Sequence, residues 1–321
     1  MTGSPEVVVR GAGVAGLVTA VTLAERGAHV RVVEAGPQVG SGASWLAGGM
    51  LAPWCEGESA PPEVTRDSLA SLDWWASHVP DVARAGTLVV APPRDRAELT
   101  RFGRRTDHFV EVDATTIAEL EPDLAGRFER GLFFDTEGHV DPRRALVALR
   151  DRLISLGGSI SFNTPEDTGP RDWTIDARGL ATRSEGLRGV RGEMLLLRCS
   201  DVTFHRPVRL LHPRMPVYVV PRADHIFMVG ATMVESEDTR GMTLRAMSEL
   251  TNAAYTLHPA FAEAEIVEMR ANLRPSFPDN IPRVWQDGRC VHVNGMYRHG
   301  FLLSPQRAAT AAAIVFGDAP A

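Results

Sequence analysis

The sequence contains only three cysteines, no lysine and no run of basic residues. The spacing of the cysteines and the distribution of charge each exclude a class of site or partner. Cys55, Cys199 and Cys290 form no CxxC pair and lie far apart, so the sequence suggests neither a zinc site nor a disulfide framework. Three isolated thiols fit a reducing cytoplasm, where we expect the protein to work. Arginine supplies all 34 basic residues, but no basic run exists and the net charge is −6, which argues against nucleic acid as a partner.

Long apolar runs are also absent. No stretch reaches the ~18 consecutive apolar residues of a membrane-spanning helix, and the N-terminal MTGSPEVVVRGAG has no basic region ahead of a long apolar run. We therefore expect neither a membrane segment nor a signal peptide. The C-terminal AATAAAIVFG is too short to span a bilayer and is typical of a core helix.

The composition that remains is that of an ordinary globular protein, and 321 residues are enough for two domains. Strands and helices alternate near both ends of the chain and enclose a strand-rich block over 187–234. Proline-rich breaks occur at 61–62, 92–93 and 275–282. Apolar periodicity predicts helices over 17–27, 67–79, 143–158 and 243–257, and strands over 6–10, 29–34, 85–93, 172–180 and 290–295. This order predicts an α/β nucleotide-binding domain with a second domain inserted into it.

A glycine-rich turn joins the first predicted strand to the first predicted helix. Gly11, Gly13 and Gly16 have the G-x-G-x-x-G spacing of a dinucleotide-binding turn, and Glu34 ends the next strand. Gly11 allows the tight turn, Gly13 lets backbone N–H groups approach a pyrophosphate, and Gly16 lets helix and strand pack closely. Glu34 can accept hydrogen bonds from ribose hydroxyls and would repel a 2′-phosphate. The turn therefore predicts a bound dinucleotide, either FAD or NAD.

Arg10 departs from this pattern, because the residue before the first glycine usually completes a buried apolar strand. A guanidinium in that position must reach solvent, a carboxylate or a phosphate. A structural partner and a direct contact with the cofactor are both compatible with the sequence.

Several further motifs follow in a fixed order along the chain. They are SGASWLAGGMLAP (41–53), VYVVPR (217–222), VGATM (229–233), NLRPSFPDNIPR (272–283) and GMYRHGFLLSP (295–305). Together with GAGVAG (11–16), they resemble the D-amino-acid-oxidase-like family of FAD-dependent oxidoreductases, and within it the glycine oxidases of thiamine thiazole formation. The resemblance implies a discontinuous FAD-binding domain of the Rossmann-like, glutathione-reductase type over 1–84, 139–190 and 272–321. It also implies an inserted antiparallel β-rich (α+β) substrate domain over 85–138 and 191–271.

The resemblance also implies which residues contact a non-covalently bound FAD. Small residues after the second strand run along the pyrophosphate and flavin in this family, and the loop 296–302 covers the flavin pyrimidine edge. The implied cofactor residues are Gly11, Gly13, Val14, Ala15, Gly16, Glu34, Ala35, Ala43, Ser44, Gly48, Gly49, Met50, Gly179, Met296, Tyr297, Arg298, His299, Gly300, Phe301 and Leu302.

Four residues are implied to contact the substrate. By resemblance Arg274 binds the substrate carboxylate, Tyr218 faces the substrate, Met233 lines its pocket, and Arg298 lies beside flavin and substrate. The residues alone leave simpler interpretations open. Arg274 precedes a proline and is compatible with a surface salt bridge in a loop, while Tyr218 and Met233 are compatible with core positions.

Two other side chains also carry alternatives. His299 is compatible with a proton shuttle or with a solvated loop histidine. Cys290 is compatible with covalent flavin attachment or, by its place in a strand, with a buried thiol. Two departures from the family's pattern lie elsewhere: the segment 163–178 is short, so its usual FAD contact has no secure position, and Pro216 stands where relatives can carry a polar residue.

The resemblance implies oxidative deamination of glycine or a similar small amino acid, with O2 reduced to H2O2 and the imine hydrolysed or passed to a thiazole synthase. It implies neither a metal nor a catalytic acid–base pair, and it favours a homo-oligomer. The alternatives are another D-amino acid, sarcosine or proline as substrate, an electron acceptor other than O2, a nicotinamide dehydrogenase, and a flavin-binding subunit that needs a partner.

Overall fold

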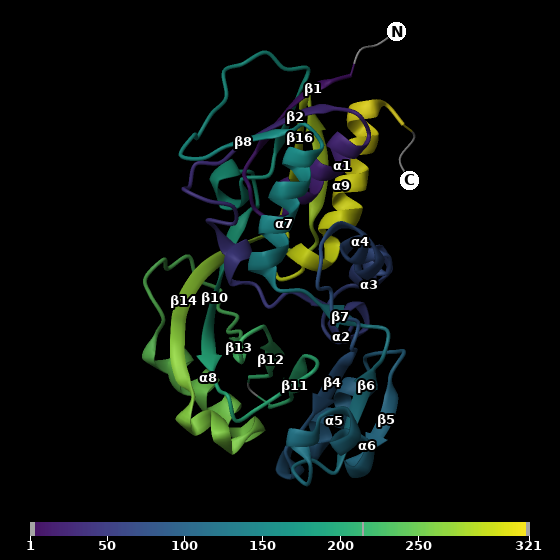
Figure 1. Ribbon diagram of the computed structural model, residues 1–321, viewed down its shortest axis with the longest axis vertical. Helices are drawn as coiled ribbons and strands as arrows, with labels where there is room; N and C mark the ends of the chain where they lie inside the picture. The colour runs from purple at the N-terminus through teal and green to yellow at the C-terminus, as the bar shows by residue number, and fades with distance from the viewer. Residues whose placement is uncertain (1–3, 214, 319–321) are drawn as a thin grey trace.

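The computed structural model describes residues 4–213 and 215–318, which fold around two large β-sheets (Figure 1). The first has the strand order β15-β16-β9-β1-β2-β8, and its neighbours are parallel except for the pair β15–β16. The carboxyl ends of its parallel strands meet at one edge, where open α/β sheets bind their ligands. The strands are β1 (Glu6–Arg10), β2 (His29–Val33), β8 (Ser159–Ser161), β9 (Trp173–Asp176), β15 (Arg283–Asp287) and β16 (Cys290–Asn294).

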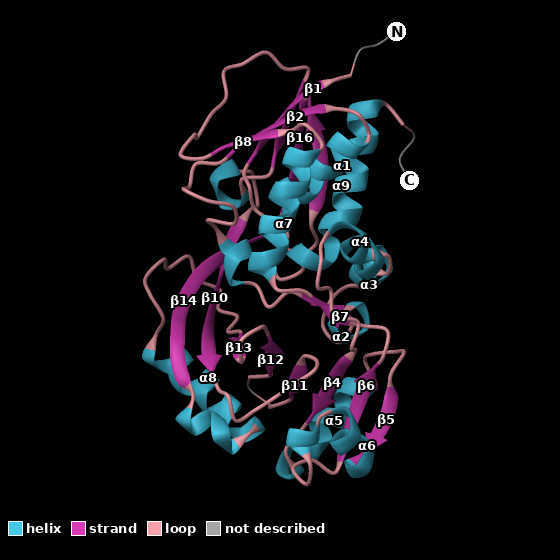
Figure 2. Ribbon diagram, viewed as in Figure 1, coloured by secondary structure: helices cyan, strands magenta, loops and turns pink. Residues whose placement is uncertain are grey.

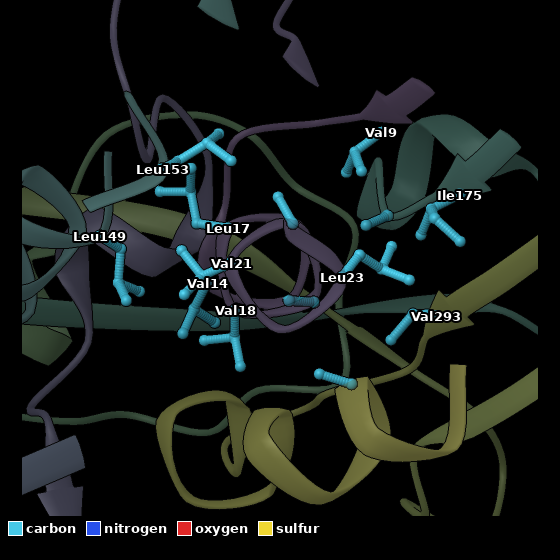
Figure 3. Close-up of a cluster of buried hydrophobic side chains, with 14 of the residues drawn as sticks. Val9, Val14, Leu17, Val18, Val21, Leu23, Leu149, Leu153, Ile175 and Val293 are labelled. Atoms are coloured by element: carbon cyan, nitrogen blue, oxygen red, sulfur yellow. The ribbon is translucent and has the colours of Figure 1, made fainter. Parts of the chain in front are cut away.

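Helix α1 (Val14–Glu25) is the centre of the core beside this sheet. It packs against α7 (Pro142–Ser155) and α9 (Gly300–Phe316), so it is apolar on nearly every side rather than amphipathic. Figure 3 shows this packing, with side chains of α1 between those of α7 and the strands: Val9, Val14, Leu17, Val18, Val21, Leu23, Leu149, Leu153, Ile175 and Val293. The burial fixes the start of α1 against the carboxyl edge of the sheet.

The second sheet lies in the lower half of Figure 2, with the strand order β14-β10-β13-β12-β11-β4-β6-β5. Its neighbours are antiparallel except for the pair β11–β4. Helix α8 (Leu244–Leu257) covers one face and buries Leu250, Ala254 and Leu257 there. The strands are β4 (Thr87–Val90), β5 (Val110–Asp113), β6 (Arg130–Phe134), β10 (Arg188–Arg198), β11 (Val208–Leu210), β12 (Val217–Pro221), β13 (Ile226–Gly230) and β14 (Glu265–Ser276).

Shorter elements complete the described part of the chain. Strand β3 (Met50–Leu51) pairs with β7 (Gly138–His139), and the helices are α2 (Pro53–Glu56), α3 (Pro62–Ser68), α4 (Ser71–His78), α5 (Arg96–Gly103) and α6 (Ala114–Leu120). Helices α5 and α6 among them pack beside strands of the eight-stranded sheet (Figure 1). Among the described residues, no helix has both the length and the apolarity to cross a bilayer.

The predicted fold class, an α/β nucleotide-binding unit combined with an antiparallel β-rich unit, is confirmed. The single helix predicted over 67–79 is wrong, because α3 ends at Ser68 and α4 begins at Ser71. The predicted break at 275–282 begins too early, because β14 continues to Ser276. Strands β10 and β14 cross the predicted domain boundaries, and the division into two domains stays a prediction.

Candidate active site

A cavity of about 660 Å³ opens at the carboxyl edge of the six-stranded sheet and continues to the eight-stranded sheet. Glu34 lines one end of it, and Tyr218 and Arg274 line the other. The structure brings every predicted site residue except Gly16 to the lining of this cavity. A single elongated ligand and a small second ligand could therefore share the cavity, while the individual contacts stay predictions.

The glycine turn has the conformation that its spacing predicts. Gly11 has a φ of +101°, a region that side-chain-bearing residues rarely adopt. A Cβ added to Gly16 would lie 1.9 Å from the carbonyl oxygen of Gly11, so only glycine lets α1 approach the strand this closely. Gly16 thus serves packing, although it does not line the cavity.

The start of α1 and the end of β2 form a cradle that fits a dinucleotide. The Oε2 atom of Glu34 accepts a hydrogen bond from the N–H of Ala12 at 2.7 Å, and its Oε1 accepts one from Gly36 at 2.8 Å. Ser44 Oγ accepts a hydrogen bond from the N–H of Val14 at 3.0 Å. A helix start leaves N–H groups without intrahelical partners and favours a phosphate, and the carboxylate beside it suits ribose hydroxyls. The residues present therefore fit the predicted cofactor.

The segment after β2 forms a wall made of backbone. Gly49 has a φ of +78°, and a Cβ there would lie 2.1 Å from the carbonyl oxygen of Val140. A Cβ on Gly48 would lie 2.8 Å from the ring of Tyr218. These two glycines let Tyr218 and the neighbouring strands approach the cavity without intervening side chains.

Arg10 does not line the cavity and instead has a structural partner. Its Nη2 atom lies 3.2 Å from Oε1 of Glu166, which belongs to the short segment 163–178. Arg31 on β2 holds the same segment by a contact of 3.2 Å with Asp167. This places Pro165 at the lining of the cavity.

Arg274 is a strand residue, which corrects the interpretation of a loop arginine. It lies in β14, and its Nη1 atom donates to the carbonyl oxygen of Thr232 at 3.1 Å. Burial lowers the pKa of Arg274 from its ordinary value. A Cβ on Gly192 of β10 would lie 2.3 Å from the guanidinium, so this glycine makes the room that the side chain occupies.

The arginines that line the cavity differ in their partners. Arg101 pairs with Glu98, Arg178 with Asp176, and both Arg209 and Arg298 with Glu56. Within residues 4–213 and 215–318, Arg274 has no carboxylate at salt-bridge distance. A partly buried guanidinium whose described hydrogen-bond partners are carbonyl oxygens keeps its charge available for an anionic ligand.

Tyr218 and Met233 lie on the same side of the cavity as Arg274. Burial raises the pKa of Tyr218, so its hydroxyl is protonated near neutral pH and can donate a hydrogen bond. Met233 is half-exposed, and its Sδ atom lies 3.4 Å from the hydroxyl of Tyr297 and 3.6 Å from Nη1 of Arg298. Both positions suit the lining of a small pocket better than a core.

Glu56 organises the loop before α9, and sequence reasoning missed it. Its Oε2 atom lies 2.9 Å from Nε of Arg298 and 3.3 Å from Nδ1 of His299, and its Oε1 lies 3.5 Å from Nη2 of Arg209. Burial acts to raise the pKa of Glu56, but Arg298, His299 and Arg209 together hold that pKa far below its usual range. These contacts favour the ionised form of Glu56 in the cavity wall.

His299 is buried, so the interpretation of a solvated loop histidine is wrong. Its side chain is 2% exposed. Burial lowers the pKa of His299 although Glu56 acts in the opposite direction, so the ring is neutral near pH 7. Its Nδ1 atom faces Glu56, and the residue immediately precedes α9.

Cys290 lies away from the cavity. It is half-buried at the start of β16, at the opposite end of the strand from Asn294, which does line the cavity. Burial raises the pKa of its thiol. The structure therefore gives no support to attachment of a flavin through Cys290.

Gly192 and Glu56 were not predicted as site residues from the sequence, and only one of them could have been. A glycine inside a predicted strand marks a close approach, so Gly192 could have been found. Glu56 carries no such signal, because nothing in PWCEGES shows that two arginines and a histidine will surround the carboxylate.

Comparison with known proteins provides a second line of evidence for what this cavity binds. The model of the DAO family, described as FAD dependent oxidoreductase, matches residues 6–314. A protein of Rhizobium etli, whose name assigns it to thiamine biosynthesis as the oxidoreductase ThiO, is 52% identical over 306 residues, or 94% of each chain. The glycine oxidase of Pseudomonas aeruginosa is 28% identical and covers 99% of this chain and 96% of its own.

Two further similarities concern chain organisation and fold. The bifunctional protein ThiO/ThiG of a Nostoc species is 24% identical over 97% of this chain, which corresponds to 52% of that protein. The crystal structure of glycine oxidase from Geobacillus kaustophilus superposes with a TM-score of 0.80 at 22% identity, covering 99% of this chain and 96% of that one.

Proposed function

Because the chain belongs to the DAO family of FAD dependent oxidoreductases, we propose that it oxidises the amine of glycine or of a similarly small amino acid. FAD, and not NAD, is the dinucleotide of this family. The similarity to a glycine oxidase along nearly the whole chain supports the choice of substrate.

The observation that carries the proposal is that Arg274 has no anionic partner among the residues that the structure describes. A planar guanidinium matches the two oxygens of a carboxylate and fixes its orientation. Tyr218, beside it in the cavity, supplies a protonated hydroxyl that can donate to the same carboxylate. Together they hold an amino acid by its carboxylate and leave its amine and Cα toward the cofactor end of the cavity.

The chain's own contribution to the reaction is positioning. Bound FAD would supply the acceptor for a hydride equivalent from the substrate, with O2 as the final two-electron acceptor and H2O2 as its product. Oxidation of this kind requires a neutral amine, and the arginines that surround the pocket disfavour the ammonium form. No side chain needs to act as a catalytic acid or base, because orientation supplies the main acceleration.

The loop 296–302 is proposed to cover the pyrimidine edge of the flavin. It supplies Arg298 and the start of α9, where backbone N–H groups lack intrahelical partners. Both features favour the negative charge that collects at that edge on reduction. Gly11, Gly13, Glu34, Ser44 and Gly48 would hold the rest of the cofactor.

We place the activity in thiamine biosynthesis, with the imine passed to a thiazole synthase. The relative assigned to thiamine biosynthesis supports the pathway, and the ThiO/ThiG chain supports a hand-off because two units share one polypeptide there. Three unpaired cysteines fit work in the cytoplasm. A homo-oligomer remains part of the proposal.

A substrate panel with a peroxide readout tests the proposal. Glycine, sarcosine, D-alanine, proline and iminodiacetate are each supplied to the FAD-loaded protein in air. We expect the highest kcat/KM for glycine. Preference for sarcosine, proline or a larger D-amino acid would keep the chemistry and change the substrate, whereas a protein that no amine reduces would indicate a subunit that needs a partner.

A further inference from the structure

The wall of the substrate end contains two guanidiniums that share the carboxylate of Glu56 and one, that of Arg274, with no carboxylate partner among the described residues. Arg298 is compensated: Nε lies 2.9 Å from Glu56, and Nη2 donates to Ser59 Oγ at 2.6 Å. Arg274 donates to the carbonyl oxygens of Thr232 and Arg191, at 3.1 Å and 3.5 Å, and has no carboxylate partner in the described part of the chain. Both arginines line the same cavity, so an incoming ligand meets both.

The partners of Glu56 show that its position is built rather than accidental. The carboxylate ends α2 and lies among Arg209 from β11, Arg298 and His299. Arg209 is buried, at 8% exposure, and also donates to the carbonyl oxygen of Cys55 at 3.3 Å. The carboxylate is thus held beside Arg298 by contacts from three sides.

We propose that Glu56 determines specificity by occupying Arg298, so that the cavity accepts amines with one carboxylate and rejects those with two. This inference rests on the proposed function and narrows its substrates to amines with a single carboxylate. The first carboxylate of any ligand pairs with Arg274. A second carboxylate on the same small molecule would approach Arg298 and find Glu56 already there.

The physical basis is repulsion between like charges in a site with little water. Two carboxylates a few Å apart repel far more strongly in a buried pocket than in bulk water. A binding site gains specificity from such a repulsive element as well as from its attractive contacts. Glycine, with a single carboxylate and no side chain, avoids the repulsion entirely.

The test compares binding of acetate and malonate to the FAD-loaded protein, followed by the perturbation of the flavin spectrum. Neither ligand is oxidised, so the result does not depend on glycine being the substrate. We expect the wild-type protein to bind acetate roughly tenfold or more tightly than malonate. Glu56→Gln, which keeps the shape and removes the charge, should lower that ratio at least tenfold or reverse it.

Two variants serve as controls. Glu56→Asp keeps the charge and should restore the preference for acetate. Glu137→Gln alters another buried carboxyl group, which bonds to the N–H of Cys55 but does not line the cavity, and it should leave the ratio unchanged. Retained flavin absorbance and a normal Tm identify variants that have folded.

The same variants are then assayed with glycine and iminodiacetate. Glu56→Gln should raise the relative kcat/KM for iminodiacetate roughly tenfold. An unchanged ligand ratio in folded Glu56→Gln would overturn the proposal, as would a wild-type protein that binds malonate as tightly as acetate. Failure of wild-type protein to oxidise glycine, with the acetate preference intact, would contradict the proposed function alone.

Discussion

The two ends of the cavity differ in how far apart in the sequence their residues lie. At the cofactor end, Gly11, Gly13 and Glu34 come from one strand–turn–helix–strand unit of 34 residues. At the substrate end, Glu56, Gly192, Arg274 and Arg298 come from α2, β10, β14 and the loop before α9. A local unit imposes backbone constraints that a motif can display, whereas a site assembled from distant elements displays its chemistry only after folding.

The ends also differ in charge. The acid of the cofactor end, Glu34, bonds to backbone N–H groups. At the substrate end, Arg209 and Arg298 both lie against the carboxylate of Glu56. Arg274 there has no carboxylate at salt-bridge distance among the described residues. Changes at the first end should therefore act on folding and FAD retention, and changes at the second on substrate binding and pH dependence.

The largest effect is expected from Gly16→Ala, which disturbs the packing of α1 at the cofactor end. The added Cβ would lie 1.9 Å from the carbonyl oxygen of Gly11, so α1 and the turn must move apart. We expect loss of bound FAD and a destabilisation of roughly 3 kcal/mol or more. Gly241→Ala, where a Cβ meets nothing within 4 Å, is the control for thermal unfolding and FAD content. Equal behaviour of the two variants would contradict the packing role of Gly16.

Arg274→Ala should damage the substrate end and spare the cofactor end. Removal of the guanidinium leaves a substrate carboxylate unpaired in a buried site, which costs about 3 kcal/mol or about 100-fold in KM for glycine. In one preparation, steady-state kinetics report on the substrate end and FAD content reports on the cofactor end. Unchanged kinetics would refute the role of Arg274, and lost FAD would show that the ends are not independent.

Stability should depend on pH through a carboxyl group behind the substrate end. Burial raises the pKa of Glu137 from 4.5 to about 7, against the opposing effect of the hydrogen bond that its Oε1 accepts from the N–H of Cys55. The folded protein therefore holds a proton that the unfolded chain releases near pH 4.5, so this group makes stability fall as pH rises from about 5 to 7. Glu137→Gln cannot titrate and should remove roughly 2 kcal/mol of that decline. Chemical denaturation at pH 5 and pH 8 measures it, and parallel declines in both proteins would contradict the shifted pKa.

Gly192→Ala should disturb the substrate end less than Arg274→Ala does. The new Cβ would lie 2.3 Å from the guanidinium of Arg274 and force it aside without removing it. We expect a roughly tenfold rise in KM for glycine, smaller than for Arg274→Ala, with FAD content unchanged. Gly189→Ala, on the same strand but outside the cavity, is the matched control.

The smallest effect is expected at the edge of the cofactor end. Arg10→Ala removes a partly exposed ion pair with Glu166, which contributes about 0.5 kcal/mol. FAD affinity should change less than about twofold, because Arg10 does not line the cavity. A tenfold loss of affinity in a dialysis titration would instead assign Arg10 a role in holding the cofactor.

The same comparison explains what could be predicted from the sequence. The turn at Gly11–Gly16 and the strand ending before Glu34 were predictable because each needs particular residues at fixed spacing. The helix over 67–79 was not, since α3 and α4 separate around Leu69 and Ala70. Of the two tryptophans there, Trp75 is buried and Trp74 is only partly buried. Arg274 looked like a loop residue because Pro275 follows it, yet edge strand β14 tolerates the proline.

Buried charge was the feature least accessible from sequence. Glu56, Arg209 and His299 lie in three separate segments, and each alone reads as a surface residue. Only the fold shows that the three are in contact and that His299 is 2% exposed. The resemblance to a family could indicate that the loop holds a cofactor, but not which carboxylate holds the loop.

The most direct measurement is the visible spectrum of the purified FAD-loaded protein before and after glycine is added without oxygen. We predict that glycine bleaches the flavin absorption of the wild-type protein and that air restores it with release of peroxide. The Arg274→Ala protein should remain yellow at the same glycine concentration. Bleaching that is equal in both proteins, or absent from the wild-type protein, would contradict the assignment of the two ends of the cavity to FAD and to a small amino acid.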